Sequence, residues 1–112
     1  MPYLKIQANK KISDEKEFIE KTSTFIAEEL NKPESYVMVL LEPEVKLSFG
    51  GNMEPAVFME LKSIGLDENM TGNLSESLCS FAEKELGVSQ DRVYIEFKDV
   101  EGSMWGWKGD TF

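Results

Sequence analysis

Side chains that carry out acid–base or nucleophilic chemistry are scarce in this sequence, which has no histidine and a single cysteine. Without histidine, Ser–His and Cys–His catalysis and imidazole-ligated metal sites are excluded. Cys79 has no second cysteine with which to form an intrachain disulfide or a cysteine-rich zinc site. Because it lies among Leu78, Phe81 and Ala82, we expect it to be a small buried hydrophobe. Any catalysis by this chain must use another group.

The start of the chain, "MPYLKIQAN", offers such a group in Pro2. An initiator methionine before a small residue is normally removed, so we expect the mature chain to begin with the secondary amine of Pro2. An exposed α-amino group titrates near ~8, and burial or a nearby lysine lowers that pKa because each disfavours the charged form. A general base works best when its pKa is close to the operating pH. The alternative, a proline tolerated as the first residue of a strand, stays open on this fragment alone.

The elements that must position Pro2 come in two similar halves, because a shift of about 56 residues superimposes the two patterns. In the first half, apolar residues at helical spacing follow a predicted N-cap, Ser13, and end at Asn31. In the second half, the same pattern starts from Leu74 and ends at Gly87. Strands are expected on both sides of each helix, at residues 3–8, 36–42, 57–63 and 92–97.

The predicted order is therefore β-α-β, repeated. Helical crossovers make the two strands of each unit parallel, with right-handed connections. Two such units predict an α+β fold, a four-stranded mixed sheet with both helices on one face. Residues 43–56 join the halves without a flexible linker, so we expect residues 1–112 to form a single domain of two pseudo-repeats.

The face of this sheet away from the helices is unusual in composition. Alternation along the strands places aromatic and apolar side chains there among charged ones, namely Tyr3, Tyr36, Met38, Leu40, Phe58 and Tyr94 with Lys5, Glu60, Lys62 and Glu96. A contiguous exposed patch of this kind usually marks an interface. We therefore predict that the chain associates with copies of itself.

Composition narrows the remaining classes of function. The formal net charge is −9, which argues against nucleic acid as a partner because a basic stripe is the usual footprint of nucleic-acid binding. No stretch approaches the ~20 apolar residues of a membrane span, and lysines interrupt the N-terminal segment where a signal peptide would have its apolar core. We expect a cytoplasmic protein, with export by a route that needs no signal peptide as the alternative.

Several short motifs together resemble the macrophage migration inhibitory factor family, the branch of the tautomerase superfamily that includes D-dopachrome tautomerase. They are "MPYLKIQ", "NKPESYVM", "KSIG", "DRVYIEF" and "WGWKGDTF", which occur in the family's order and at similar spacing along the whole chain. Each motif is weak alone, but the set is specific. The resemblance implies two βαβ units packed as a trimer, a tautomerase activity and no cofactor or metal.

The resemblance also implies roles for individual residues. Pro2 matches the N-terminal proline that acts as catalytic base and acid, and Lys32 matches the lysine that binds a substrate carboxylate and keeps the proline amine neutral. Ser63 and Ile64 match residues that line the pocket. Tyr94 matches a tyrosine at the neighbouring subunit's edge of that pocket. The aromatic wall positions are matched by Tyr36, Trp107 and Phe112.

The chain departs from the family pattern at three of the substrate-binding positions. Glu96 stands where relatives often have asparagine, so a carboxylate there raises the proline pKa or repels an anionic substrate. Lys62 stands where histidine is frequent and adds positive charge at the pocket mouth, and Trp105 replaces a smaller apolar residue and narrows the pocket. The stretch "PAVFME" lacks the Cys-x-x-Cys of some members, so the thiol–disulfide activity of that motif is not expected.

We therefore expect a homotrimeric keto–enol tautomerase of the phenylpyruvate or dopachrome type, which acts on a small 2-oxo acid or its enol in pockets between subunits. Two alternatives remain open. One is a cytokine-like or host-factor-mimicking binding protein with a vestigial site, whose host or cell-surface receptor the sequence does not identify. The other is a hydratase or decarboxylase that uses the same proline.

Overall fold

Eleven short and long elements make up the fold in a computed structural model that describes all residues, 1–112. The long ones are β1 (Tyr3–Ala8), α1 (Glu15–Leu30), β2 (Met38–Glu42), β3 (Val57–Ser63), α2 (Glu68–Leu86) and β4 (Val93–Asp99). Three single 3₁₀ turns and two short strands complete the list: Glu34–Tyr36, Gln90–Arg92, Gly102–Met104, β5 (Gly106–Trp107) and β6 (Asp110–Thr111).

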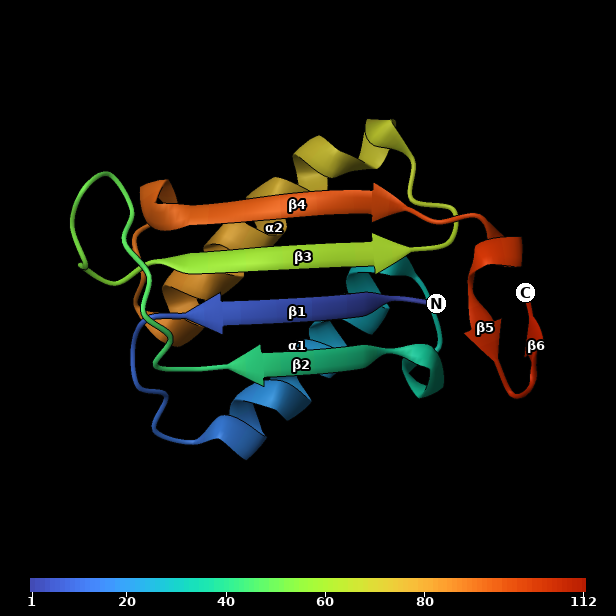
Figure 1. Ribbon diagram of the computed structural model, residues 1–112, viewed down its shortest axis with the longest axis horizontal. Coiled ribbons are helices and arrows are strands. Elements are labelled where there is room, and N and C mark those ends of the chain that lie inside the picture. Colours follow the sequence, from blue (N-terminus) through green and yellow to red (C-terminus); the bar gives the residue numbers. More distant parts are fainter.

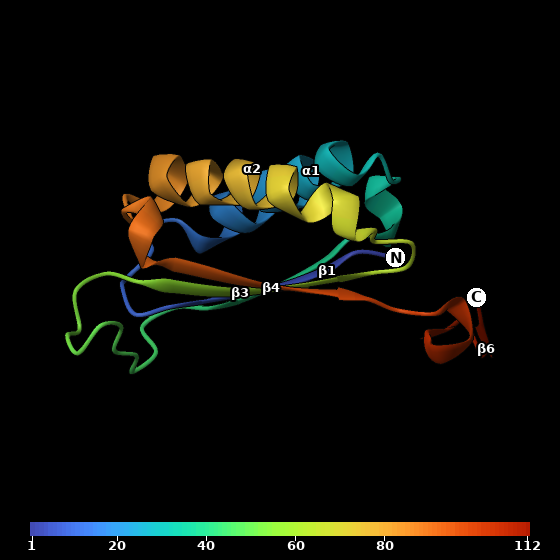
Figure 2. The same ribbon diagram turned by 90° about the horizontal axis from the view of Figure 1, so that it is seen from above.

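The main sheet is mixed, with strand order β2-β1-β3-β4. The pairs β1–β2 and β3–β4 are parallel, as two helical crossovers require, and the central pair β1–β3 is antiparallel. Figure 1 shows the four strands side by side, and Figure 2 shows both helices on one face of the sheet. The predicted fold class, two β-α-β units with helices on one face, is confirmed.

The core lies between the sheet and the two helices. Strand residues that face the helices are fully buried, as the alternating pattern along β1 and β3 requires, whereas their neighbours on the other face are only half-buried. Leu4 and Ile6 from β1, Met59 and Leu61 from β3 and Leu78 from α2 have 0% exposure. Burial of each such side chain contributes about 1.5–3 kcal/mol to the stability of the fold. The central strands β1 and β3 therefore form a rigid support for the residues at their ends.

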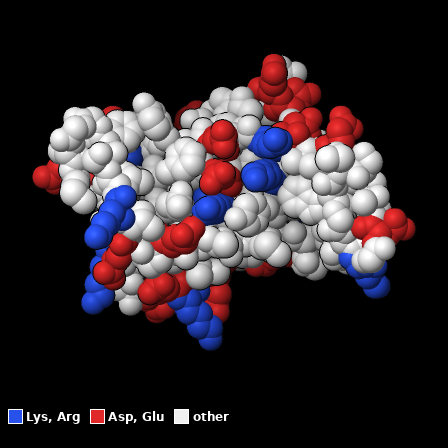
Figure 3. Space-filling model, viewed as in Figure 1, with Lys and Arg blue, Asp and Glu red and all other residues white.

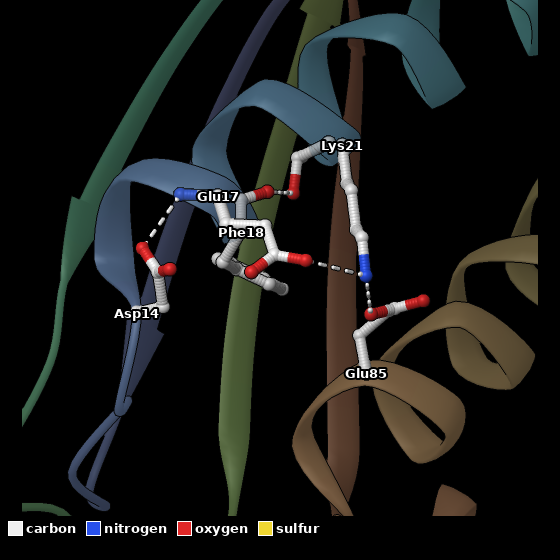
Figure 4. Close-up of polar contacts among 6 residues, drawn as sticks. Asp14, Glu17, Phe18, Lys21 and Glu85 are labelled. Atoms are coloured by element: carbon white, nitrogen blue, oxygen red, sulfur yellow. Dashed lines mark hydrogen bonds and ion pairs between the residues drawn. The ribbon is translucent and has the colours of Figure 1, made fainter.

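The helices begin and end at residues with the expected conformations, apart from one start. Asp14, not Ser13, is the N-cap of α1, because its carboxylate accepts a hydrogen bond from the Glu17 N–H at 3.0 Å (Figure 4). Both C-caps are confirmed as left-handed residues, Asn31 with φ 53° and Gly87 with φ 68°.

Lys21 joins the two helices on their outer surface. Its ammonium lies 3.2 Å from the Glu17 carboxylate on α1 and 3.4 Å from the Glu85 carboxylate on α2 (Figure 4). The hydrogen bond that Lys21 donates to the Glu17 carboxylate and the charge of Glu85 raise the pKa of Lys21. Because the ammonium is exposed, this bridge contributes little to stability.

Two segments differ from the expectation or extend it. Tyr36 is the last residue of a 3₁₀ turn, and β2 begins only at Met38, so Tyr36 does not join the open face of the sheet as predicted. At the C-terminus, β5 and β6 form a hairpin beyond the end of the main sheet (Figures 1 and 2). Lys108 and Gly109 both have positive φ, 55° and 81°, which is the conformation that a tight two-residue hairpin needs.

The connection between the halves is held in place by two side chains. The Asn9 amide donates to the carbonyls of Leu47 and Glu54, both at 3.0 Å, and its oxygen accepts from the Ala56 N–H at 2.8 Å. The Arg92 guanidinium donates to the Phe49 carbonyl at 3.2 Å and to other carbonyls of the same loop.

Neither helix is long and apolar enough to cross a membrane.

Candidate functional site

Several of the predicted site residues meet at one end of the sheet. The start of β1, the segment after α1 and the end of β3 all lie there, and the C-terminal hairpin stands beside them (Figure 1). The sheet register explains the meeting, since Tyr3 pairs with Met38 on one side and with Lys62 on the other. Pro2 therefore lies between the start of β2 and Ser63 at the end of β3.

Pro2 is buried, with less than 2% of its surface exposed. Its carbonyl oxygen accepts a hydrogen bond from the Met38 N–H at 3.0 Å, which ties the residue to the first position of β2. The terminal amine beside it, which in this structure belongs to Met1, has its pKa lowered by burial and, to a smaller extent, by the positive charge of Lys32. This end of the sheet thus favours a neutral amine.

Lys32 reaches this place because α1 ends just before it. Asn31 takes the left-handed conformation with φ 53°, and the Lys32 N–H then donates to the Ala27 carbonyl at 2.9 Å. Its ammonium forms no ion pair with a carboxylate, so its charge is free to act on the chain terminus or on an anion. The Lys32 ammonium also donates no hydrogen bond within the chain.

The three predicted wall residues form one aromatic cluster. Trp107 and Phe112 are stacked, with ring centroids 5.5 Å apart, and Tyr36 meets both rings edge-on at 5.6 Å and 6.4 Å. All three residues are 37–48% exposed, so the cluster is an open surface rather than part of the core. Such a surface suits an aromatic ligand, which prefers stacked or edge-on neighbours.

Ser63 is the last residue of β3, and Ile64 begins the tight turn that follows. Ser63 is 1% exposed, and its carbonyl accepts from the Val100 N–H at 3.0 Å. The turn itself is held by Asp99, whose Oδ1 accepts from the backbone N–H groups of Gly65 at 3.0 Å and Leu66 at 3.1 Å. Sequence reasoning missed Asp99, although an aspartate at a strand end is a common partner for turn N–H groups.

Lys62 and Trp105 line a groove on the open face of the sheet, close to the same end. The groove has a volume of about 390 Å³, and its other lining residues are Tyr3, Lys98, Val100, Met104 and Gly106. The Lys62 ammonium lies 5.9 Å from the centre of the Tyr3 ring, within the range of a cation–π contact. Lys98 was not singled out in the sequence, and only the strand register reveals it as the neighbour of Lys62.

Tyr94 lies away from the other site residues within the chain, whereas Glu96 stands opposite Glu60 near the middle of the sheet. Tyr94 pairs with Phe58, which in turn pairs with Gln7, four residues along β1 from Tyr3. At ~3.3 Å per residue this places Tyr94 roughly 13 Å along the sheet from Tyr3, and one residue further from Pro2, on the outer strand. Its ring is 64% exposed and packs 4.7 Å from the Phe49 ring, beside a separate cavity of about 320 Å³.

Other depressions of the surface lack these features. A wider one, of about 730 Å³, lies between α1 and α2 and is lined mainly by charged and polar side chains. No group of three or more Asp, Glu or Cys side chains comes together in a way that would hold a metal ion. The end of the sheet at Pro2 is therefore the candidate site.

The whole chain matches one family model, described as "Macrophage migration inhibitory factor (MIF)", over residues 1–112. The macrophage migration inhibitory factor homolog of Trichinella spiralis is 37% identical over 114 aligned positions that cover 100% of both proteins. Its structure has a TM-score of 0.93 to this chain and covers 98% of it and 99% of the Trichinella chain. The homologue from Prochlorococcus marinus is 43% identical, with a TM-score of 0.92 and 98% of each chain covered.

Proposed function

The chain belongs to the macrophage migration inhibitory factor family of the tautomerase superfamily, and on that premise we propose that it is a keto–enol tautomerase. Its substrate in this proposal is a small 2-oxo acid of the arylpyruvate type or the corresponding enol. Pro2 is the catalytic base and acid once Met1 has been removed. The reaction takes place at the end of the sheet where β1 begins.

The burial of Pro2, together with the effect of the Lys32 charge on the adjoining terminal amine, is the observation that carries this proposal. Burial and Lys32 lower the pKa of the terminal amine that precedes Pro2. We expect both causes to act on the secondary amine of Pro2 when that becomes the terminus, because each disfavours the charged form. A neutral amine at neutral pH can accept a proton, which is the first requirement for a base.

In the proposed reaction, the Pro2 nitrogen takes a proton from the carbon next to the ketone. The electron pair of that C–H bond forms the C=C bond of the enolate, and the carbonyl π electrons move to oxygen. A proton then returns to that oxygen to give the enol, so that atoms and charge balance; the reverse sequence converts enol to ketone. Fixed positioning of the substrate is the main source of acceleration in this scheme, which uses no cofactor or metal.

The other site residues hold the substrate in this proposal. Lys32 binds the carboxylate of the 2-oxo acid, and Ser63 and Ile64 line the place of the reacting carbons. The aromatic cluster of Tyr36, Trp107 and Phe112 receives the ring of the substrate. Its open, edge-on arrangement supports that role because an inserted ring would bury surface that is now half exposed.

Tyr94 and Glu96 complete the site only if a second copy of the chain contributes them. Within one chain both lie on the outer strand β4, with Tyr94 toward the opposite end of the sheet from Pro2 and Glu96 near its middle. We propose that a homotrimer brings these residues of one subunit to the Pro2 end of the next. The large exposed side chains on the open face, Met38 at 64% and Leu40 at 39%, support such an assembly.

The first experiment measures tautomerisation of phenylpyruvate by the wild-type chain, by Pro2→Gly and by a chain with one extra alanine before Pro2. Mass spectrometry of the N-terminus shows which preparations have lost Met1. We expect the extended chain to be inactive, since its Pro2 nitrogen is an amide, and Pro2→Gly to lose at least 100-fold in kcat/KM, on the order of an acid–base contribution. Unchanged activity in either variant, with fold and assembly intact, would overturn the mechanism.

A second experiment tests the site between subunits by mixing inactive variants. Pro2→Gly and Tyr94→Ala chains, unfolded together and refolded as mixed oligomers, should regain part of the wild-type activity, because some sites then combine an intact Pro2 with an intact Tyr94. Each variant refolded alone is the control. A mixture no more active than its components would place Tyr94 outside the pocket. Absence of turnover on any 2-oxo acid by well-folded wild type would favour the binding-protein alternative.

A further inference from the structure

Lys62 and Lys98 are direct neighbours across the β3–β4 pair, and neither forms an ion pair. Like charges directly opposite each other on a sheet destabilise it. The contrast with Lys5, on the same face, is clear, because the ammonium of Lys5 lies 3.4 Å from Glu42 and 3.9 Å from Glu60. The next pair on this face is Glu60 opposite Glu96, yet neither carboxylate lies within ion-pair distance of Lys62 or Lys98.

The surroundings of this lysine pair form a groove rather than a flat surface. Tyr3 and Trp105 supply aromatic walls, and the cavity of about 390 Å³ has no carboxylate among its lining residues. Figure 3 shows this face of the sheet, where Lys or Arg patches lie next to each other between the acidic centre of the sheet and the uncharged surface over the C-terminal hairpin. An anion in the groove would meet positive charge on one side and aromatic surface on the other.

The groove adjoins the Pro2 site. Tyr3, which lines it, follows Pro2 directly in the chain, and Lys62 is the residue before Ser63. Trp105 belongs to the same C-terminal segment as Trp107 and Phe112, whose rings form the aromatic cluster. A small molecule held at Pro2 can therefore place a second substituent toward Lys62 and Lys98.

We propose that Lys62, Lys98 and Trp105 form a second anion subsite, and that the substrate is an aryl 2-oxo acid with an additional carboxylate or phosphate group. The identity of the substrate rests on the proposed function, whereas the binding of an anion to the groove does not. Lys32 holds the 2-oxo acid carboxylate, and the lysine pair holds the second acidic group. The two lysines thus select dianionic over monoanionic substrates.

Direct binding tests the subsite without any enzymatic reaction. In a Trp107→Phe background, Trp105 is the remaining tryptophan, so its fluorescence reports ligands in the groove. Isophthalate and inorganic phosphate are titrated as probes, with benzoate as the monoanion. We expect isophthalate to bind at least tenfold more tightly than benzoate, with an affinity that falls as salt is added, because Lys98 is exposed and Lys62 is only half-buried.

Lys62→Gln and Lys98→Gln should each weaken isophthalate binding at least fivefold, and more than they weaken benzoate binding. Lys46→Gln is the matched control, since Lys46 is an exposed lysine outside the groove. The competing explanation is that Glu96 of a second copy, which the proposed trimer brings to the Pro2 end, compensates the lysine pair. Weakened assembly in ultracentrifugation, with isophthalate binding unaffected by either substitution, would establish that explanation and overturn the subsite.

Kinetics then test the substrate class. The KM for 3-carboxyphenylpyruvate should be at least tenfold below that for phenylpyruvate, and Lys98→Gln should remove that difference while kcat stays within twofold. Equal KM values for the two substrates in active wild type would overturn the substrate assignment. If the chain has no tautomerase activity but binds isophthalate through both lysines, the proposed function fails and the anion site stands.

Discussion

Asp99 positions the turn that carries Ile64, and replacement of Asp99 by alanine tests how much the turn depends on it. Its Oδ1 accepts from the Gly65 N–H at 3.0 Å and from the Leu66 N–H at 3.1 Å. Gly65 is exposed, so water replaces the lost bond there, but Leu66 is only 4% exposed and its N–H would be left without a partner. A hydrogen bond to a charged group contributes about 1.5–3 kcal/mol, so we expect Asp99→Ala to lower the free energy of unfolding by about 2 kcal/mol.

Urea unfolding measures this loss, at one fixed protein concentration because assembly would make stability depend on concentration. The slope with urea should stay the same, since the surface exposed on unfolding does not change. Asp99→Asn keeps the Oδ1 acceptor and should recover more than half of the loss. Asp91→Ala is the control, because the Asp91 carboxylate accepts only from the exposed Ser89 hydroxyl, at 2.7 Å.

The same variants separate stability from the binding of substrate. A displaced Ile64 should raise KM for phenylpyruvate in Asp99→Ala more than it lowers kcat, and Asp99→Asn should recover most of that rise. If Asp99→Ala is no less stable than Asp91→Ala, the two hydrogen bonds do not hold the turn. The assignment of Asp99 as a positioning residue would then be wrong.

Two further predictions concern the terminal amine and the C-terminal hairpin. Lys32→Met should raise the pKa of the terminal amine, because the positive charge that helps lower this pKa is removed while burial remains. The acid limb of the kcat/KM profile should therefore move to higher pH. An unmoved limb, which is the result expected for the control Lys46→Met, would contradict this prediction. Gly102→Ala should destabilise the hairpin by about 1–3 kcal/mol, since its Cβ would lie 2.9 Å from the Phe112 carbonyl oxygen. Gly72→Ala, with open space around the added Cβ, should instead stabilise α2 by about 0.5–1 kcal/mol, and equal effects of the two changes in thermal unfolding would refute the close contact.

The fold was predictable from the sequence because the period of the apolar residues changes cleanly from two in the strands to that of a helix, twice. The errors in this prediction are confined to single residues at the ends of elements. Ser13 and Asp14 are adjacent and both are good caps, so pattern alone does not choose between them. The sequence predicts a strand from Tyr36 because nothing in "YVMVLLE" marks Tyr36 as the end of the 3₁₀ turn that precedes β2.

The site was predictable in part, and the missing part has a physical reason. Short motifs indicated Pro2 and Lys32, and the structure brings them to one end of the sheet. Lys98 and Asp99 have no motif of their own, because their roles come from register: each stands opposite a residue of β3, Lys62 or Ser63. Register between strands depends on long-range pairing, which a single sequence does not display.

The position of Tyr94 links the proposed chemistry to assembly. Within one chain, the parallel pairing of β3 with β4 fixes Tyr94 opposite Phe58, and a strand in a packed sheet cannot slide without turning every side chain to the other face. Tyr94 therefore cannot approach Pro2 of its own chain by a local rearrangement. If both residues touch one substrate, two chains must come together. Burial of the exposed apolar side chains on the open sheet face would stabilise that contact between chains. In this proposal the mixed charged and apolar character of that face is a requirement of the active site as much as of the oligomer.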